Sequence, residues 1–589
     1  MCGINGFSWD DDSLIRKMNK ILAYRGPDDT GIYSEKDMSL GHNRLSIIDL
    51  SDAGHQPMCN EDRTVWLVFN GEIYNHREIR PILKKKGHKF QSHTDSEVII
   101  HSYEEYGTGC LERFNGMFAF ALWDSKKKML FLARDRIGVK PLYYHFDGKN
   151  IIFSSEIKAI LRHEIVREIS KDALNSFLTY RFIPGPSTIL QGIRKLLPAH
   201  YLIFRDGRIS LKRYWSLSWK PDYKSQKELE TEVENLLSDS VRMRLESDVP
   251  LGAYLSGGLD SSLIVALNAK LRKDSIKTFT VGFGHESDEF AHAHKVAHYI
   301  GTEHREVIVD YNEMTRELPH IVWLMDEPSS DITMMPMYFL SKFSKRYVTV
   351  VNTGEGADET FSGYHHYKIG AESFRFVPDS IRKGIYRWYY SPFKSKERKR
   401  MLGFKAAEDR ALASQLSKHG DLLSNILHFE IENELPNWQL ARVDRMTMAN
   451  AIEARVPFLD YRLVELSAKI PSCMKQRGLS GKHILKKIAS KYLPKSIVQR
   501  KKQGFTTPRE EWIRRDLHDL AEQMLSRENI TSRGLFKQEY VASLIDNAKT
   551  MRKDLPFRPV SYKILMLVML ETWFRTYLDH DGAKPVRFQ

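Results

Sequence analysis

The pattern of hydrophobic and polar positions changes once along the chain, near residue 226. Before that point, short apolar runs alternate with turn-rich segments such as Arg25-Gly26-Pro27-Asp28-Asp29. This spacing predicts antiparallel sheets with a few helices, one of them over Asp95–Tyr106. The predicted strands are Ser39–Leu50, Val65–Tyr74, Met117–Trp123, Met129–Arg134, Leu142–His145 and Ile151–Ser155.

From about Gln226, apolar strands alternate with amphipathic helices, which is typical of a parallel sheet wound on both faces. Beyond Val443 the pattern is mainly helical. Polar residues and a proline at Trp215–Lys227 indicate a linker, so we predict an α+β domain at 2–214 and an α/β domain at 228–580. The predicted elements of the second domain are the strands Leu251–Leu255, Thr278–Phe283, Glu306–Val309 and Tyr347–Val351 and a helix over Ser261–Arg272.

Composition narrows the class of protein. The 589 residues are 42% hydrophobic and 28% charged, a balance typical of soluble globular proteins. Four scattered cysteines without zinc-site spacing favour a reducing, cytoplasmic setting, and neither a signal peptide nor a membrane span is expected. The net charge is +14, but its densest run, Lys394–Arg400, contains no aromatic residue, so we expect no nucleic-acid partner and no membrane association.

Cys2 directly follows the initiator Met1 and opens the run Cys2-Gly3-Ile4-Asn5-Gly6-Phe7. Removal of Met1 would leave one residue with both a thiol nucleophile and a free α-amine that can act as its base. A lone cysteine at position 2 is more often an accident of a terminus, so its interpretation depends on motifs further along the chain.

The strand Leu251–Leu255 runs into Ser256-Gly257-Gly258-Leu259-Asp260-Ser261-Ser262 and then into a helix. Paired glycines permit a turn in which backbone N–H groups and serine hydroxyls converge on an anion at the helix N-terminus. The lysine of a Walker A loop is absent, and the GxGxxG pattern does not occur here. The run resembles the pyrophosphate loop of ATP pyrophosphatases, and Asp260 is expected to bind Mg²⁺.

A second loop follows the strand at Tyr347–Val351. It reads Thr353-Gly354-Glu355-Gly356-Ala357-Asp358-Glu359, and one helical turn would place Glu355 and Asp358 on a common face. One carboxylate can hold a metal while the other takes part in proton transfer. Because ligands bind at the carboxyl ends of parallel strands, both loops are expected to line one crevice.

Seven blocks together resemble the B-type glutamine-hydrolysing asparagine synthetases over nearly the whole chain. This resemblance implies an N-terminal-nucleophile glutaminase domain of the class II glutamine amidotransferases, followed by an ATP-pyrophosphatase synthetase domain. The blocks are MCGI at 1–4, RGPDD at 25–29, HNRLSIIDL at 42–50, NGEIYN at 70–75, SGGLDSS at 256–262, TGEGADE at 353–359 and DRMTMANAIEARVPFLD at 444–460.

In the glutaminase domain, the resemblance implies that Cys2 attacks the glutamine carboxamide and that Asn70 and Gly71 form the oxyanion hole. Arg44 corresponds to the residue that binds the substrate carboxylate, and Glu72 and Asp95 correspond to acceptors for its ammonium group. The implied glutamine-binding residues are Arg44, Leu45, Ser46, Ile47, Ile48, Asn70, Gly71, Glu72 and Asp95.

In the synthetase domain, the resemblance implies Mg²⁺ at Asp260 and Asp358, and Glu355 acting at the acyl-adenylate. Lys502 matches a loop lysine that stabilises the charged intermediate, although its neighbour Lys501 leaves the choice between the two open. The implied ATP-binding residues are Tyr254, Leu255, Ser256, Gly257, Gly258, Asp260, Ser261, Val281, Thr353 and Gly354.

The implied reaction joins ammonia from glutamine to an aspartate that ATP has adenylated, and the chain is expected to use glutamine, aspartate, ATP and Mg²⁺, with a homodimer possible. A relative that amidates another carboxylate, such as a sugar acid or a secondary metabolite, stays open. A nucleic-acid-binding or regulatory protein on an inactive scaffold is disfavoured by the intact Cys2, Asp260, Glu355 and Asp358.

Overall fold

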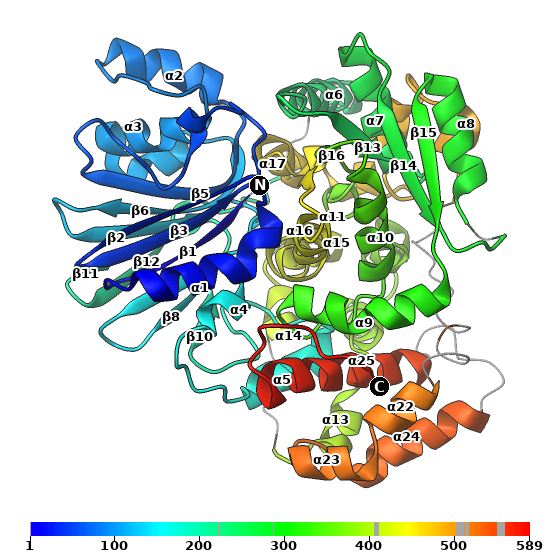
Figure 1. Cartoon of the computed structure of the whole chain (residues 1–589). Helices are drawn as coiled ribbons and strands as arrows, with labels where there is room; N and C mark the ends of the chain where they lie inside the picture. Colours follow the sequence, from blue (N-terminus) through cyan, green and yellow to red (C-terminus); the bar gives the residue numbers. More distant parts are fainter. Residues whose placement is uncertain are drawn as a thin grey trace.

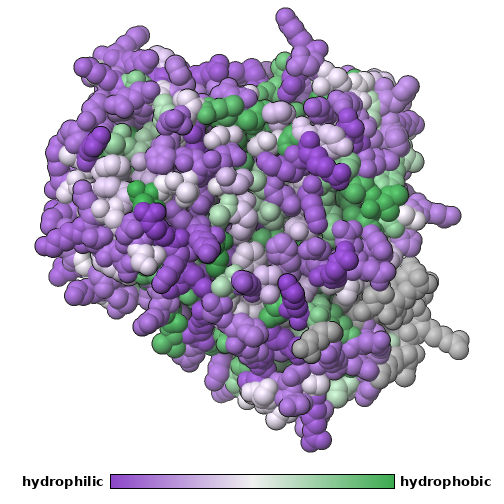
Figure 2. Space-filling model, viewed as in Figure 1, coloured by the Kyte–Doolittle hydropathy of each residue, from purple (hydrophilic) through white to green (hydrophobic). Residues whose placement is uncertain are grey.

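The computed structural model describes residues 2–221, 224–286, 288–405, 411–501, 512, 518–550 and 560–588. It divides into an N-terminal part built on two antiparallel sheets and a C-terminal part built on one parallel sheet with many helices (Figure 1). The face seen in Figure 2 is largely hydrophilic, with small separate apolar areas. Within the described residues, no helix is long and apolar enough to cross a membrane.

The N-terminal part stacks two six-stranded sheets, in the orders β10-β8-β9-β1-β3-β2 and β12-β11-β7-β6-β5-β4. Alternate residues of each strand point to opposite faces, so that Ile4 of β1 packs between the sheets while Phe7 packs against α1. The strands are β1 Gly3–Phe7, β2 Asp29–Glu35, β3 Met38–Arg44, β4 Met58–Cys59, β5 Val65–Ile73, β6 Gly116–Asp124, β7 Met129–Arg134, β8 Tyr143–Phe146, β9 Ile151–Ser154, β10 Ile193–Lys195, β11 His200–Arg205 and β12 Arg208–Arg213.

Helices cover the outer faces of this pair of sheets. Apolar residues of α1 and α4 join the core on one side, and those of α2 and α3 join the core on the other. The result is a four-layer arrangement of helix, sheet, sheet and helix. The helices are α1 Asp12–Leu22, α2 His76–Lys85, α3 Glu97–Tyr106, α4 Ile157–Ile160 and α5 Lys171–Tyr180.

The antiparallel prediction is confirmed, with one strand predicted too long. The strand predicted at Ser39–Leu50 ends at Arg44, because the following residues leave the sheet to line a pocket. The strands β1, β2, β4 and β10 to β12 were not predicted individually from the sequence.

The C-terminal part contains a five-stranded parallel sheet in the order β15-β14-β13-β16-β17. Residues of α6, α7 and α8 pack on one face of the sheet, and residues of α9 and α10 pack on the other. The strands are β13 Leu251–Tyr254, β14 Lys277–Gly282, β15 Glu303–Ile308, β16 Val350–Asn352 and β17 Glu453–Arg455, and the helices are α6 Gln226–Met243, α7 Leu259–Leu271, α8 Phe290–Ile300, α9 Tyr311–Met325 and α10 Met334–Ser344.

The predicted doubly wound sheet is therefore present. The chain adds strands on one side of β13 and then crosses to the other side at β16, which creates a topological switch point beside the two predicted loops. The predicted strand at Tyr347–Val351 begins only at Val350, and the short strand β17 lies within the region predicted to be mainly helical.

The remaining residues form a helical layer around and below this sheet (Figure 1). Its described helices are α11 Ala357–Phe361, α12 Asp379–Tyr390, α13 Ser395–Met401, α14 Ala411–Gln415, α15 Leu422–Phe429, α16 Leu440–Met448, α17 Tyr461–Lys469, α18 Ser472–Lys475, α19 His483–Ala489, α20 Lys495–Val498, α22 His518–Met524, α23 Arg527–Arg533, α24 Gln538–Thr550 and α25 Val560–Phe574.

Buried charges join the two parts. Arg25 bonds to Glu156 at 2.7 Å within the N-terminal part and to Asp444 on α16 at 2.9 Å. Arg445 reaches back to Glu156 at 2.6 Å and to Asp326 at 3.3 Å. These five side chains are at most 2% exposed, so each charge depends on its partners for compensation.

We expect Arg445→Ala to lower the free energy of unfolding by about 3–5 kcal/mol, because it removes one of the positive charges that compensate the buried Glu156 and Asp326. Arg16→Ala is the control, since Arg16 pairs with Asp12 where both side chains are more than half exposed. Urea denaturation measures the difference, and equal stability of the two variants would contradict the interpretation.

Candidate functional site

The first pocket surrounds Cys2, at the start of β1. The backbone N–H of Cys2 donates to Asn70 Oδ1 at 3.0 Å, and the carbonyl of Cys2 accepts from Arg25 Nε at 3.1 Å. Burial raises the pKa of the Cys2 thiol. The thiol is therefore neutral near pH 7 and needs a base before it can act as a nucleophile. Residues of the pocket are Cys2, Arg44, Leu45, Ile47, Ile48, Gly54, Gln56, Phe69, Gly71, Glu72, Thr94, Asp95 and Ser96.

Asn70 and Gly71, on β5, are the predicted oxyanion donors. Asn70 uses its side-chain oxygen on Cys2, and its Nδ2 group is buried with no hydrogen-bond partner among the described residues. A buried amide donor without a partner is costly unless a ligand completes it. At Gly71 any Cβ would lie 2.1 Å from the carbonyl oxygen of Met117, so only glycine permits this close approach of β5 to β6.

Arg44, at the end of β3, lies in the same pocket. Its guanidinium donates to the carbonyl oxygens of Ser51, at 3.0 Å, and of Asp49. A Cβ on Gly54 would lie 1.8 Å from Arg44 Nη2, so the glycine makes room for the guanidinium. These contacts fix the planar group at the pocket wall, where it can bind a carboxylate.

Two acidic residues complete the pocket. Burial, and after it the charge of Asp95, raises the pKa of Glu72 well above its ordinary value. Burial likewise raises the pKa of Asp95, whose Oδ2 accepts the N–H of Ile73 at 2.7 Å. A pair of buried carboxyl groups with raised pKa values favours a ligand that brings a positive charge.

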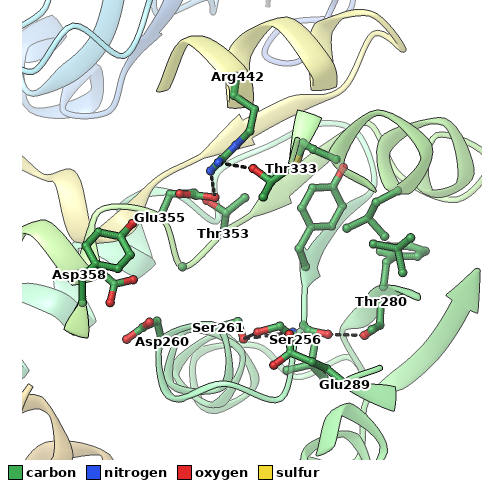
Figure 3. A pocket seen from close by; sticks show the side chains of 18 residues that line it. Ser256, Asp260, Ser261, Thr280, Glu289, Thr333, Thr353, Glu355, Asp358 and Arg442 are labelled. Carbon is green, nitrogen blue, oxygen red and sulfur yellow. Dashed lines mark hydrogen bonds and ion pairs between the residues drawn. The ribbon is translucent and has the colours of Figure 1, made fainter. Parts of the chain in front are cut away.

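The second pocket is a cavity of about 300 Å³ at the carboxyl ends of β13, β14 and β16 (Figure 3). Of the predicted ATP-binding residues, Gly257 and Gly258 do not line this cavity. Gly258 instead lines an adjoining pocket, which Lys501 also lines. The lining residues are Tyr254, Leu255, Ser256, Asp260, Ser261, Phe279, Thr280, Val281, Glu289, Thr333, Met337, Leu340, Thr353, Gly354, Glu355, Asp358, Tyr364 and Arg442.

The glycine-rich loop takes the conformation that its sequence predicts. Gly257 has a φ of +67°, and a Cβ there would lie 2.5 Å from the backbone of His292 on α8. Ser256 and Ser261 lie with their hydroxyl oxygens 3.1 Å apart, and Gly258 caps α7 without any side-chain cap. The first turn of α7 therefore presents N–H groups and hydroxyls to the cavity, as an anion requires.

Glu355 and Asp358 line the same cavity but have different partners (Figure 3). Glu355 precedes α11 and pairs with Arg442 Nη2 at 2.9 Å, while Asp358 lies in the first turn of α11. Lys482 Nζ lies 2.6 Å from Asp358 and 2.5 Å from Asp260. Glu355 and Asp358, which were predicted to share a helical face, therefore lie in one cavity, and each belongs to a different ion pair.

Arg442 and Lys482 were not found from the sequence. Arg442, on α16, also pairs with Asp331 at 2.8 Å, and it lies two residues before the last motif block. Lys482 stands at the start of α19, where an isolated basic residue gives no signal in a single sequence. Lys502, the predicted loop lysine, lies outside the described residues, and Lys501 lies at the adjoining pocket.

Arg455 on β17 connects the two pockets. Its guanidinium lies 2.6 Å from Glu453 and 3.3 Å from Glu72 of the Cys2 pocket. Its carbonyl oxygen accepts the N–H of Thr353, a residue that lines the second cavity. One fully buried residue therefore contacts both pockets, and sequence reasoning had placed it only within a motif block.

Comparisons with known proteins agree on both parts of the chain. Residues 1–215 match the glutamine amidotransferase domain family, and residues 232–575 match the asparagine synthase family. Glutamine-hydrolysing asparagine synthetase 1 of Bacillus subtilis is 33% identical, with 93% of each chain covered. Glutamine-hydrolysing asparagine synthetase 3 of the same organism is 31% identical, with 99% of this chain and 100% of the relative covered.

Among solved structures, the glutamine phosphoribosylpyrophosphate amidotransferase of B. subtilis in complex with ADP and GMP matches 52% of this chain and 65% of that chain. The sequence identity is 15% and the TM-score is 0.28, which is too low to support a conclusion.

Proposed function

The chain belongs to the family of glutamine-hydrolysing asparagine synthetases, and we propose that its two pockets carry out the two half-reactions of that family. It is an ATP-dependent ligase that makes asparagine from aspartate with glutamine as the nitrogen donor. We assign glutamine hydrolysis to an N-terminal-nucleophile domain at 2–214 and synthesis to an ATP-pyrophosphatase domain at 228–580.

The observation that carries the assignment of the first pocket is the buried Asn70 Nδ2, which has no partner among the described residues and lies beside Cys2. After loss of Met1, the α-amine of Cys2 takes the thiol proton, and the sulfur attacks the carboxamide carbon of glutamine. Asn70 Nδ2 and the N–H of Gly71 stabilise the developing oxyanion. Ammonia leaves, and water then hydrolyses the thioester to glutamate.

The remaining groups of this pocket orient the substrate. Arg44 binds the α-carboxylate of glutamine with its fixed planar guanidinium. Glu72 and Asp95 accept the α-ammonium group, whose positive charge relieves the crowding of two buried carboxyl groups. Leu45, Ile47 and Ile48 line the pocket after β3 ends, whereas Ser46, which was also predicted, does not.

In the second pocket, we assign the phosphates of ATP to the loop Ser256–Ser261 and its nucleoside to the cavity wall around Tyr254, Leu255 and Val281. The β-carboxylate of aspartate attacks the α-phosphorus, which gives β-aspartyl-AMP and pyrophosphate. Ammonia then displaces AMP. We assign to Glu355, which lines the cavity, the proton that ammonia loses.

The acidic residues of this pocket fit a magnesium ion. Asp260 and Asp358 both lie within 2.6 Å of one ammonium group, so two carboxylates already converge on a cationic position. They would hold Mg²⁺, which neutralises phosphate charge when it is bound. Lys482 also neutralises phosphate charge, because its ammonium group lies beside the phosphate loop.

We assign the α-carboxylate of the acceptor aspartate to Arg442. Its guanidinium lies at the wall of the cavity between Glu355 and Asp331, and Thr333 Oγ1 lies 2.6 Å from its Nη1 atom. A planar group with two donor edges suits a carboxylate ligand.

A cytoplasmic location is proposed because all four cysteines are free, and a homodimer is proposed from the family resemblance.

We expect Cys2→Ala to reduce glutamine-dependent synthesis by about 10³-fold or more, because the nucleophile is lost, while free ammonia still supports synthesis. Asparagine, AMP and pyrophosphate are quantified by mass spectrometry with each nitrogen source. Cys473→Ala, at an exposed cysteine, is the matched control and retains both activities. Loss of ammonia-dependent synthesis in a folded Cys2→Ala protein, or formation of ADP, would refute the division into two sites.

The raised pKa of Glu72 predicts that glutamine binding weakens in acid. As the pH falls, Glu72 takes up a proton at pH values where an ordinary glutamate is still ionised, and the neutral group attracts the substrate ammonium less. The KM for glutamine should therefore rise, by up to about tenfold per pH unit below that pKa. Glutamate formation measures it, and the Glu72→Gln variant should show a high KM with a weaker pH dependence, since Asp95 still titrates in the pocket. A constant wild-type KM down to about pH 5 would contradict this assignment.

We expect Arg442→Met to raise the KM for aspartate about ten- to a hundredfold, because a charged hydrogen-bond partner of the acceptor is lost. Pyrophosphate release in the presence of ammonia measures the effect. The glutaminase activity of the same variant is the internal control and should be unchanged. An unchanged KM for aspartate would exclude Arg442 from acceptor binding.

A further inference from the structure

Two histidines and a glutamate meet at the outer edge of the parallel sheet, away from the loops described above. His304 and Glu306 are alternate residues of the edge strand β15 and therefore point to the same face. His294 faces them from α8, which packs beside this strand. The nearest ligand atoms of the three side chains all lie within 4.8 Å of one another.

Two separations between these side chains are close to the edges of a tetrahedral zinc site, and they end on the two different oxygens of Glu306. His294 Nε2 lies 3.2 Å from Glu306 Oε2, and His304 Nε2 lies 3.3 Å from Glu306 Oε1. Bonds of about 2.0–2.1 Å from zinc to each ligand give tetrahedral edges of about 3.3–3.4 Å. A rotation of the carboxylate or of an imidazole ring would place one oxygen and two nitrogens around one ion, since such a set of atoms already lies within 4.8 Å.

The environment of His304 supports the same reading. Its Nδ1 atom lies 2.9 Å from Thr278 Oγ1, which in turn lies 2.9 Å from Thr302 Oγ1. Nε2 lies 3.3 Å from Glu306 Oε1, to which it can donate; with a cation between them, Nδ1 would donate to Thr278 and the Nε2 lone pair would face the cation. A histidine ligand held through its second nitrogen in this way is typical of metal sites, because the outer contact fixes both the tautomer and the ring.

The charges nearby also suit a cation. Within the described part of the chain, both ion pairs of Glu306 are with histidines, and no lysine or arginine neutralises it. The side chain of His304 is 6% exposed, whereas that of His294 is 63% exposed. Solvent can therefore reach the position between the ligands and supply a fourth donor.

A second group of similar composition, at His88, His101 and Glu104, lacks this arrangement. Both nitrogens of each of its histidines already face a carboxylate, at 2.9–3.6 Å. Each ring is therefore held as a double donor, which leaves no lone pair for a metal. The group at the sheet edge differs because His304 directs one nitrogen to a threonine hydroxyl.

We propose that His294, His304 and Glu306 bind one Zn²⁺ ion, with water as the fourth ligand. The ion would tie α8 to the edge of the sheet. Glu289, the residue before α8, lines the second pocket, and His292 of α8 packs against Gly257 of the glycine-rich loop. Zinc binding is therefore expected to stabilise the wall of the nucleotide pocket from outside.

The test measures metal stoichiometry in the full-length protein. Protein freed of metal is titrated with Zn²⁺ against a chromophoric chelator, with excess Mg²⁺ to occupy the acidic residues of the second pocket. All proteins carry Cys473→Ala to remove the exposed thiol. We expect one equivalent of Zn²⁺ in the parent protein, and at least about tenfold weaker binding at this site in His294→Ala and in Glu306→Gln.

His298→Ala is the matched control, because His298 is exposed on the same helix, one turn beyond His294. It should bind Zn²⁺ like the parent protein. Co²⁺ provides a second readout, since a tetrahedral site gives intense visible absorption that the two ligand variants should lack. His294 is largely exposed, so its variant is expected to fold, and far-UV circular dichroism checks this. Equal Zn²⁺ stoichiometry and affinity in the parent, His294→Ala and Glu306→Gln proteins would overturn the proposal.

Discussion

A cluster of fully buried charges at the boundary between the two domains holds the rest of the molecule in place. Removing ions from water costs several kcal/mol each, and this cost is offset only where every charge meets its counter-charge. Arg25 and Glu156 from one domain and Asp444 and Arg445 from the other satisfy one another in the observed arrangement. Arg25 also bonds to the carbonyl of Cys2, so the docking of the domains and the position of Cys2 depend on the same contacts.

The same boundary brings the two chemistries together. Arg455 contacts Glu72 of the Cys2 pocket with its side chain and Thr353 of the second pocket with its backbone. In the proposed reaction, ammonia released beside Cys2 must reach the adenylate before water does, and a boundary made of buried, mutually compensated groups helps to exclude water.

The parts of each site that could be predicted are those in which neighbouring residues act together. The loop at Ser256–Ser261 was predicted because a strand, two glycines, serines and a helix follow one another directly. Asn70 and Gly71 were predicted from the family motif, and they lie beside Cys2. Arg442 and Lys482 escaped prediction because their partners, Glu355 and Asp260, lie far away along the chain. The strand predicted at Ser39–Leu50 was too long because apolar residues that line a pocket look like strand residues in a sequence.

The sequence by itself determined the order of the domains, their sheet types and the short motifs, since periodicity, turn residues and adjacent functional groups are local properties of the chain. Only the tertiary structure decided which distant charges pair, which carboxyl groups acquire raised pKa values and which residue spans both pockets. Those properties depend on burial and on distances between separate elements, and neither is encoded at any single position.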